Sequence, residues 1–529
     1  MQTLRSATIA PSAMVATPHH LATSAGLETL RAGGSAMDAA IAANAVLTVL
    51  YPDQTSIGGD CFFLAWDAAS AEATAFNGSG AAPKRADPDE LRNQGVSAMP
   101  RRGPLCVLVP GTVDAWVEGH QRYGRLPFDQ LFGAAIRYAR DGFPVSLRLA
   151  DVLRAQRDTI AGLPELAALF LANGSPPSSG ERLAFPALAE SLELIAREGR
   201  EPFYEGTIAA QIDATMRELG GWLTNDDLAR HAGEWVEPLV APYRDIEVLT
   251  VPPNSVGLTL LLALKMIDRL DLGAVWGAGD HLHPLIEAKK LAFTVRNATL
   301  ADPRFVDIDT NALLSRRSVD RLLDAYDPEG AGDGQVALPG DTVYLCAVDR
   351  DGNAVSMIQS MFQSFGSGVV AGDTGIILQN RGTYFSLTPD HPNELAPGKR
   401  TLHTLMPALL RQDGRLLGPI GTQGGDAQMQ VLLQLITDLL DFGMEPQAAI
   451  DTPRWLAGGG PDAAPFAVLL ESGFPEITLP GLARRGHQLT VIDPWNPNAG
   501  HAQMILLDHQ TGMLRGAADP RADGSAAGY

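Results

Sequence analysis

The stretch Leu338-Pro339-Gly340-Asp341-Thr342 is followed directly by Val343-Tyr344-Leu345-Cys346-Ala347-Val348. The Pro-Gly pair marks a break in regular structure, and the apolar, β-branched run after it predicts a buried strand. Thr342 is therefore expected at the first position of a core strand, in the interior of a chain of 529 residues. The simplest interpretation of a Thr in this position is that it is a good β-former.

The same placement is what a self-cleaving hydrolase with an N-terminal nucleophile needs. In such an enzyme the chain is cut before a hydroxyl residue, and the freed α-amine becomes the base for that hydroxyl. Residues 315–338, which precede this point, lose apolar periodicity and gain Asp, Gly and Pro. They predict a cleavable, solvent-reachable linker, and residues 329–334 are expected to be its most flexible part.

A β-hairpin is predicted immediately after Thr342. Asp351-Gly352 is a typical hairpin centre, and residues 354–360 form the returning strand. Folding about this turn places Thr342 opposite Ser360 or its neighbour Met361. The Ser360 hydroxyl can then orient the Thr342 hydroxyl, and the alternative is an ordinary polar cross-strand pair.

Two glycines, Gly424 and Gly425, lie between a predicted strand end at residues 416–420 and a predicted helix at residues 427–442. Glycines before a helix allow backbone N–H groups to point at an anion. In an amidase these groups would form an oxyanion hole. The alternative is a tight turn in which Asp426 caps the helix.

Short motifs along nearly the whole chain, in one order, resemble those of the γ-glutamyltranspeptidase family. They lie at residues 33–40, 56–60, 109–112, 220–228, 252–255, 341–342, 351–355, 365–370, 397–400, 424–425 and 518–521. The resemblance implies an α/β fold, the four-layer αββα N-terminal-nucleophile hydrolase sandwich, made from two fragments of one precursor. The large chain is expected at 1–341, mostly helical with N-terminal strands, and the small chain at 342–529. The fragments are expected to stay associated, and a homodimer of these heterodimers is left open.

Carried over residue by residue, the resemblance implies autocatalytic cleavage between Asp341 and Thr342. Thr342 is then the nucleophile of an acyl-enzyme mechanism. Ser360 takes the place of the family's second, supporting Thr, and Gly424 and Gly425 take the oxyanion-hole positions. A second Gly-Asp-Thr, at residues 372–374, does not stand at the family's nucleophile position.

The positions that would bind substrate depart from the family. An Arg that holds the substrate's α-carboxylate in γ-glutamyl enzymes falls near Ser79, and a Ser pair is replaced by His403 and Thr404. The positions that would hold the α-amino group carry Phe362, Arg381 and Tyr384. A cation at Arg381 repels an ammonium group and attracts a carboxylate.

The runs 379–382 and 398–404 resemble the oxamate amidohydrolase branch of the family. The expected function is hydrolysis of a small carboxylate-bearing amide, oxamate-like, with the carboxylate held by Arg381, His403 and Thr404. Alternatives are a γ-glutamyltransferase or glutathione hydrolase, an amidase resembling the cephalosporin acylases, and a processing-dead scaffold. The alternative for Arg381 is a surface or ion-paired side chain, and for His403 a structural, hydrogen-bonded imidazole.

Composition limits the partners. The net charge is −21, from 40 basic and 61 acidic residues, and no basic run occurs. This argues against nucleic acid or an anionic membrane as partner, and leaves a small-molecule amide. Three cysteines are too few for a disulfide framework and fit a reduced compartment, and Cys346 is expected to be a core residue. Residues 1–20 lack the apolar core of a signal peptide, so a cytoplasmic location is expected without a membrane span.

No cofactor and no metal are expected. The pairs His19-His20 and His281-x-His283 lack the helical spacing with a Glu that a zinc protease needs, and the second pair is expected in a loop before a helix. Elsewhere the pattern predicts mixed α/β structure, with a capping box of Ser35 and Asp38 opening a buried helix. A strand is predicted at 61–66, mainly helices at 128–270, and clear helices at 259–270 and 283–296.

Overall fold

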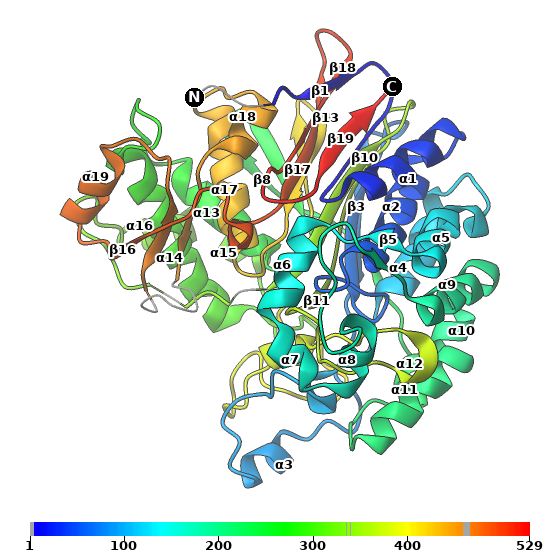
Figure 1. The fold of residues 1–529 in the computed structure, drawn as a ribbon. Helices are drawn as coiled ribbons and strands as arrows, with labels where there is room; N and C mark the ends of the chain where they lie inside the picture. Colours follow the sequence, from blue (N-terminus) through cyan, green and yellow to red (C-terminus); the bar gives the residue numbers. More distant parts are fainter. Residues whose placement is uncertain (1–4, 335, 339, 459–465) are drawn as a thin grey trace.

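The computed structural model describes residues 5–334, 336–338, 340–458 and 466–529, so Pro339 of the predicted break lies outside the described residues. Two seven-stranded antiparallel sheets face each other at the centre of the molecule (Figure 1). The first sheet has the order β1 (Thr8–Ala10), β18 (Met513–Ala518), β17 (Ala502–Asp508), β13 (Arg415–Thr422), β12 (Ala408–Gln412), β9 (Ile246–Thr250) and β8 (Leu239–Tyr243). The second has the order β19 (Ser525–Gly528), β2 (Met14–Thr17), β10 (Asp341–Val348), β11 (Ala354–Phe362), β3 (Asp60–Asp67), β4 (Glu72–Gly78) and β7 (Glu234–Val236).

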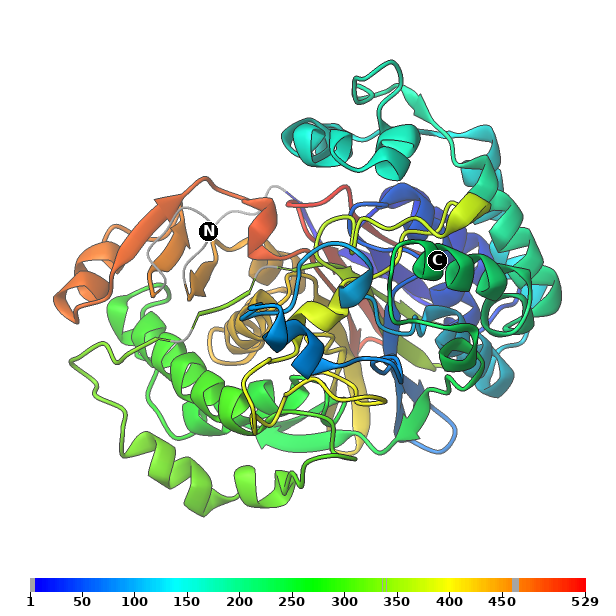
Figure 2. The ribbon, with the colours of Figure 1, turned by 90° about the horizontal axis from the view of Figure 1, so that it is seen from below.

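Helices cover the outer face of each sheet, on opposite sides of the molecule (Figure 2). The second sheet is covered mainly by α1 (His20–Arg31), α2 (Ala36–Leu50), α4 (Thr112–Tyr123), α5 (Gly133–Asp141) and α9 (Pro186–Glu198). The first is covered by α13 (Gly257–Ile267), α14 (Gly279–Thr299), α17 (Ala427–Leu440) and α18 (Pro446–Asp451). The expected αββα sandwich is confirmed.

Apolar side chains pack in the space between the two sheets and form a core there. Phe62, Tyr344 and Ile358 of the second sheet meet Leu409 and Ile505 of the first, and all five are fully buried. The run after Thr342 is apolar at every position because β10 is a central strand, buried on both faces.

The remaining elements extend the edges of the sandwich. The helices are α3 (Pro88–Asn93), α6 (Leu147–Ala155), α7 (Arg157–Ala161), α8 (Pro164–Phe170), α10 (Glu201–Tyr204), α11 (Thr207–Glu218), α12 (Asn225–Ala229), α15 (Thr310–Leu313), α16 (Arg316–Leu323) and α19 (Thr478–Arg484). The strands are β5 (Phe143–Pro144), β6 (Arg182–Leu183), β14 (Trp455–Ala457), β15 (Val468–Glu471) and β16 (Leu489–Ile492). Short 3-10 turns are η1 (Pro104–Cys106), η2 (Phe128–Phe132), η3 (Gly372–Thr374), η4 (Arg381–Tyr384) and η5 (Pro497–Ala499).

Several local predictions are confirmed. The capping box is formed, with Ser35 Oγ accepting from the Asp38 N–H and the Asp38 carboxylate accepting from the Ser35 N–H. The predicted strand at 61–66 lies within β3, and the predicted helices at 259–270 and 427–442 correspond to α13 and α17. Cys346 is buried, as expected of a core residue, and Cys61 and Cys106 are buried as well; all three are free.

The region 128–270 is mainly helical, as predicted, and it also supplies β7, β8 and β9 to the two sheets. Two local predictions are wrong. Part of the predicted linker, residues 316–323, is the helix α16. His281 and His283 lie inside α14 and are buried, not in a loop before a helix. No helix in the described ranges is long and apolar enough to cross a bilayer.

Candidate active site

A register shift in the central hairpin sets the position of Thr342. Asp341 pairs with Phe362 and Val343 pairs with Gln359, with a β-bulge between them. Thr342 therefore falls opposite Ser360 and Met361, which confirms the predicted cross-strand placement. Bulges of this kind re-aim a side chain and are frequent beside active sites.

The hydroxyl of Ser360 joins Thr342 to the carbonyl that precedes it. Thr342 Oγ1 donates to Ser360 Oγ at 3.2 Å, and Ser360 Oγ donates to the carbonyl oxygen of Asp341 at 2.5 Å. The N–H of Phe362 donates to the same Ser360 oxygen at 2.7 Å, which fixes its orientation. Ser360 thus polarises the carbonyl of the Asp341–Thr342 bond while holding the hydroxyl beside it. Both Thr342 and Ser360 are only 1% exposed in the uncut chain.

A buried ion pair supports the other side of Thr342. With its amide oriented to satisfy its neighbours, Gln54 donates from its side-chain nitrogen to the Thr342 carbonyl oxygen at 2.9 Å, and its oxygen accepts from Arg148 at 3.2 Å. Arg148 makes two hydrogen bonds to Asp53, at 2.7 and 3.0 Å. These residues come from the chain after α2 and from α6. The sequence alone does not point to them, because no local pattern links them to Thr342.

The predicted oxyanion-hole glycines lie directly under the segment that precedes the nucleophile. Gly424 and Gly425 have φ of +130° and +57°, which L side chains rarely adopt. A Cβ at Gly425 would come within 2.5 Å of the Gly340 nitrogen and 2.9 Å of the Leu338 carbonyl oxygen. The uncut chain therefore covers Gly425 with its own backbone.

Asp426 is the N-cap residue of α17, as the alternative interpretation expected, but its side chain makes no capping hydrogen bond and instead holds that segment in place. Its backbone N–H donates to the Leu338 carbonyl at 3.1 Å, and its carboxylate accepts from the Leu338 N–H at 2.8 Å. The carboxylate also accepts from Arg296 at 2.5 Å and from the Tyr384 hydroxyl at 2.7 Å. Neither Arg296 nor Asp426 was predicted as a site residue.

Arg381 is a buried cation with unused donors. It is 1% exposed, its Nη1 donates to Thr404 Oγ1 at 3.0 Å, and its guanidinium lies 4.4 Å from the centre of the Phe362 ring. Within the described part of the chain, its Nε and Nη2 have no hydrogen-bond acceptor. Burial lowers the pKa of Arg381 to about 10, although Asp60 and the Tyr384 side chain act in the opposite direction. A buried cation with two free N–H groups is costly, so an anionic ligand fits here.

His403 is less available to a ligand. Its Nδ1 accepts from the Leu405 N–H at 3.3 Å, so its Nε2 carries the proton and donates to Asp60 at 2.9 Å. Burial, followed by the nearby charges of Arg381 and Arg400, lowers the pKa of His403 well below its usual range. Burial raises the pKa of Asp60 to about 7. Because both ring nitrogens have protein partners, the structural interpretation of His403 is favoured.

Two further positions singled out in the sequence carry no catalytic geometry. The Ser79 hydroxyl donates to Asn77 at 2.6 Å, so the place of the family's Arg is filled by a neutral polar pair. Thr374 of the second Gly-Asp-Thr lies in η3, and its hydroxyl donates to the carbonyl of Ala371. It does not begin a strand.

Two facing antiparallel sheets between helix layers, with a buried hydroxyl residue at the start of a central strand, define the class of N-terminal-nucleophile hydrolases. The family model described as gamma-glutamyltranspeptidase matches residues 22–529. The chain belongs to this family and is a hydrolase that acts on amides.

Several known proteins are similar to this chain over nearly its whole length. A glutathione hydrolase-like YwrD proenzyme of Bacillus subtilis is 41% identical, over 97% of this chain and 98% of the relative. An oxamate amidohydrolase proenzyme of Klebsiella pneumoniae is 38% identical, over 99% of this chain and 100% of the relative. The crystal structure of a cephalosporin acylase from Bacillus halodurans is 38% identical, covers 100% of this chain and 98% of its own, and has a TM-score of 0.93.

Replacing Ser360 tests the link between the Thr342 hydroxyl and the Asp341 carbonyl. Ser360→Ala should slow cleavage of the chain by roughly 10²–10³, because it removes the hydrogen-bond donor to the carbonyl that becomes an oxyanion. Time courses on denaturing gels measure the rate. Ser356→Ala is the matched control, since Ser356 lies on the same strand and its buried hydroxyl contacts Tyr344 instead. Equal cleavage rates for the two variants would contradict the role of Ser360.

The Asp341 carboxyl makes a pH-dependent contribution to the stability of the uncut chain. Burial and then the Asp53 carboxylate raise the pKa of Asp341 to about 7, although the side chain keeps intermediate exposure. The unfolded value is about 3.9, so the folded state retains the proton between these values and loses stability as the pH rises through that window.

Thermal unfolding of Thr342→Ala, which keeps the chain uncut, should therefore be compared with Asp341→Asn/Thr342→Ala from pH 5 to 8. The double variant should lose less stability across this range, because its neutral amide has no proton to release. Every other titrating group is common to both proteins. Parallel curves would show that Asp341 titrates normally.

Proposed function

We propose that the chain is a precursor that cleaves itself between Asp341 and Thr342 and then hydrolyses a small carboxylate-bearing amide, oxamate first among them. The proposal for maturation rests on the Thr342–Ser360–Asp341 hydrogen bonds. The proposal for the substrate rests on one observation, that Nε and Nη2 of buried Arg381 have no hydrogen-bond partner in the described ranges. The large fragment is residues 1–341 and the small fragment is residues 342–529.

Maturation begins with attack of Thr342 Oγ1 on the carbonyl carbon of Asp341. The Ser360 hydroxyl, 2.5 Å from that oxygen, stabilises the negative charge that develops on it. The C–N bond to Thr342 breaks, the Thr342 nitrogen takes up the proton, and an ester joins Asp341 to the Thr342 oxygen. Water hydrolyses the ester and leaves a carboxylate on Asp341 and a free amine on Thr342.

After cleavage, the Thr342 hydroxyl attacks the substrate. The free α-amine of Thr342 accepts the proton of its own hydroxyl, the oxygen attacks the substrate carbonyl, and the N–H groups of Gly424 and Gly425 receive the oxyanion. The leaving amine departs with the proton, which for oxamate gives ammonia. Water attacks the acyl-enzyme and releases the acid, here oxalate.

Arg381 supplies the charge that selects the substrate. A planar guanidinium grips a carboxylate through two parallel N–H groups, which a lysine reproduces poorly. An α-ammonium group would instead meet this cation. The nearby carboxylates of Asp60 and Asp426 are already occupied, by His403 and by Arg296 and Tyr384. Phe362 and Tyr384 add an aromatic wall, and Thr404 orients Arg381.

The names of the relatives point to three different substrates, glutathione, oxamate and cephalosporins. Overall sequence similarity therefore does not distinguish between these three substrates. The positive charge of Arg381 favours oxamate, the small anionic one. Acyl transfer to an amine would use the same acyl-enzyme. His403 contributes indirectly, through its hydrogen bond to Asp60.

The two fragments stay together because their strands alternate in both sheets. In the second sheet β10 and β11 of the small fragment lie between β2 and β3 of the large fragment. In the first, β18, β17, β13 and β12 lie between β1 and β9. Separating the fragments would break strand pairing on both sides of each set. The three free, buried cysteines support a reducing compartment such as the cytoplasm.

Cleavage should give fragments of 341 and 188 residues (529 minus 341) that elute together in gel filtration. Edman sequencing of the smaller fragment should begin Thr-Val-Tyr-Leu. Thr342→Ala should remain one chain without amidase activity, because it has no hydroxyl to attack the bond. A small fragment that begins at Thr374, or anywhere else, would overturn the assignment.

Substrate choice is tested with oxamate, its neutral analogue oxamide, glutathione, a γ-glutamyl anilide and glutaryl amides. The cleaved enzyme should prefer oxamate to oxamide, because only oxamate carries the carboxylate. Arg381→Lys should raise the KM for oxamate more than tenfold, since a poorly paired buried charge costs several kcal/mol and about 1.4 kcal/mol is tenfold. Arg381→Met should lose the preference over oxamide.

Gel analysis of the same variants supplies the control, because cleavage at Thr342 does not use Arg381 and should continue. If the enzyme turns over glutathione efficiently and ignores oxamate, the γ-glutamyl alternative replaces this proposal. Preference for glutaryl amides would favour the acylase alternative. A single uncut band after prolonged incubation would indicate the processing-dead scaffold.

A further inference from the structure

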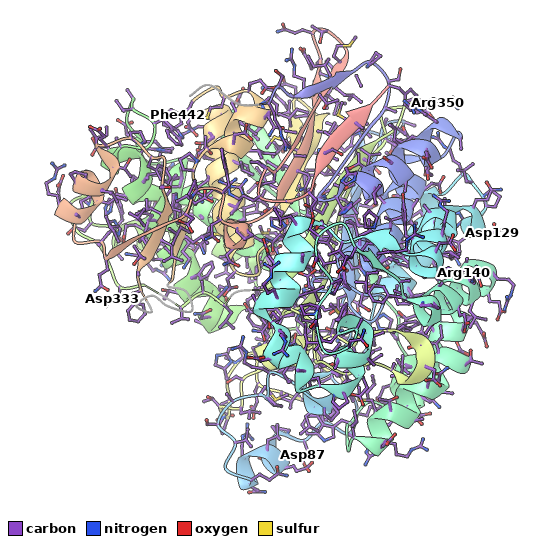
Figure 3. All side chains as sticks on the ribbon, in the orientation of Figure 1. Asp87, Asp129, Arg140, Asp333, Arg350 and Phe442 are labelled. Atoms are coloured by element: carbon purple, nitrogen blue, oxygen red, sulfur yellow. The ribbon has the colours of Figure 1, made fainter. Side chains whose placement is uncertain are left out.

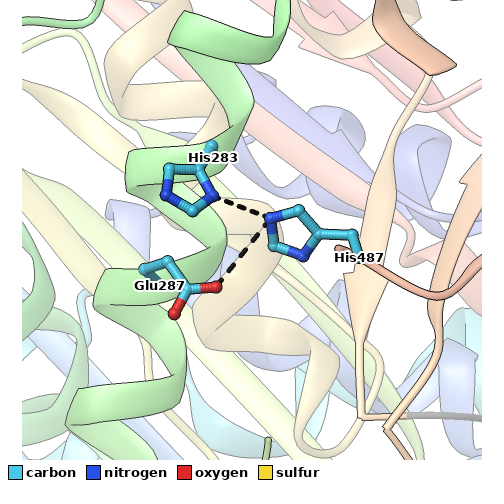
Figure 4. Close-up of side chains that lie close together, drawn as sticks. All are labelled: His283, Glu287 and His487. Carbon is cyan, nitrogen blue, oxygen red and sulfur yellow. Dashed lines mark hydrogen bonds and ion pairs between the residues drawn. The ribbon is translucent and has the colours of Figure 1, made fainter. Parts of the chain in front are cut away.

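A cluster of buried polar side chains lies far from Thr342, on the side of the molecule that carries α14 and α19. It consists of His283, Glu287 and Lys290 on α14, and of Arg485 and His487 just after α19. All five are buried, with exposed fractions of 1 to 7%. Figure 4 shows three of them, with His487 reaching between His283 and Glu287. The mechanism proposed above uses none of them.

The cluster binds the backbone of the segment that leads to the cleavage site. His283 Nε2 lies 2.8 Å from the Asp327 carbonyl, and Arg485 Nε donates to the Pro328 carbonyl at 2.9 Å. The Ala331 N–H donates to the Arg485 carbonyl at 2.6 Å. The Gly332 N–H donates to Glu287 at 3.0 Å, and the Gly332 carbonyl accepts from Lys290 at 2.8 Å.

The same contacts fix the protonation of the two imidazoles. A carbonyl can only accept, so His283 Nε2 carries a proton and the neutral ring leaves Nδ1 as an acceptor. His487 Nε2, 2.8 Å away, must therefore donate to it. Burial lowers the pKa of His487 to about 3 and also lowers that of His283, which keeps both rings neutral.

His283, Glu287 and His487 also place three possible metal ligands within 4.8 Å of one another. The donor set would suit zinc. However, Glu287 already accepts from the Lys290 ammonium at 2.7 Å, and its second oxygen accepts from Gly332. A dication would have to share this carboxylate with a buried ammonium and with Arg485 nearby. The charges therefore favour a hydrogen-bonded network over a metal centre.

We propose that this cluster, the tail clip, binds residues 327–332 as the last fixed point of the large fragment and fastens it to the small fragment after cleavage. The proposal rests on the cleavage proposed above. Three members of the clip precede the cut and two follow it, so the clip joins the two fragments. Asp333, at the edge of the molecule in Figure 3, is exposed and begins the nine residues between Gly332 and the cut end at Asp341.

The clip gives those nine residues a defined role. Leu338 and Gly340 lie over Gly425, so this stretch must move before a substrate reaches the glycines. Because the clip binds backbone groups only as far as Gly332, residues 333–341 can move away from the glycines after cleavage while residues 327–332 stay bound. The residues expected from sequence to be the most flexible, 329–334, thus include the anchor of the tail.

Hydrogen–deuterium exchange on the full protein tests this division. Exchange is compared between uncut Thr342→Ala and the cleaved wild type. The amides of Ala331 and Gly332 should stay protected after cleavage, whereas the Leu338 amide should exchange at least tenfold faster. Loss of protection at Ala331 and Gly332 together with Leu338 would overturn the proposal. A single band on the gel would instead show that cleavage itself has failed.

Substitutions separate the clip from general stability. Glu287→Leu/Lys290→Leu removes both charges together, so no unpaired buried charge remains, and it should speed exchange at Gly332 at least tenfold. Arg485→Ala removes the side-chain donor to the Pro328 carbonyl and should expose the tail to proteolytic trimming, although the backbone carbonyl that accepts from the Ala331 N–H remains. Arg484→Ala, an exposed neighbour, is the matched control and should change neither. Unchanged exchange at Gly332 in the double variant would overturn the clip. Loss of protection at Ala331 and Gly332 on treatment with EDTA, and its return on addition of zinc, would also overturn it, because the site would then be a metal centre.

Discussion

The bulge in the β10–β11 pairing is the constraint on which the rest of the site depends. It turns Thr342 toward Ser360 at the point where the strand begins, while the Ser360 hydroxyl reaches back to the Asp341 carbonyl. A regular pairing would give Thr342 an ordinary place in the ladder. The apolar residues of β10 then hold this geometry rigidly, because the strand is buried between the first sheet on one face and the helices that cover its own sheet on the other.

Charge is distributed unevenly around this hairpin. Asp53 pairs with Arg148, Asp426 pairs with Arg296, and Asp60 pairs with His403, so the acidic groups near the site are engaged. Arg381 is different, because it has a neutral hydroxyl and aromatic rings as neighbours, and its Nε and Nη2 have no acceptor among the residues that the structure describes. On a protein of net charge −21, a local cation is what an anionic substrate would need to enter.

The segment before the cut belongs to the architecture of the site. Its end lies on the glycines that we assign to the oxyanion hole, held by Asp426, and its beginning is bound by side chains of α14 and of the chain after α19. One stretch of backbone thus blocks the site in the uncut chain and connects both prospective fragments. The alternating strands of the two sheets add the larger part of that connection.

The sequence by itself determined the family, the four-layer class, and the strand of Thr342 with its hairpin partner, because these follow from local patterns and from motifs in a fixed order; the strand begins one residue earlier than expected, at Asp341. It also singled out Arg381 as a cation where an ammonium site was expected. Only the tertiary structure decided that Arg381 has unused donors and that His403 is occupied by Asp60. Only folding brought Gln54, Arg148 and Arg296 to the site, gave the Asp426 carboxylate its partners, and brought His487 to His283. These contacts join segments far apart in the chain, and hydrogen-bond partners at such separations leave no periodicity or spacing to read.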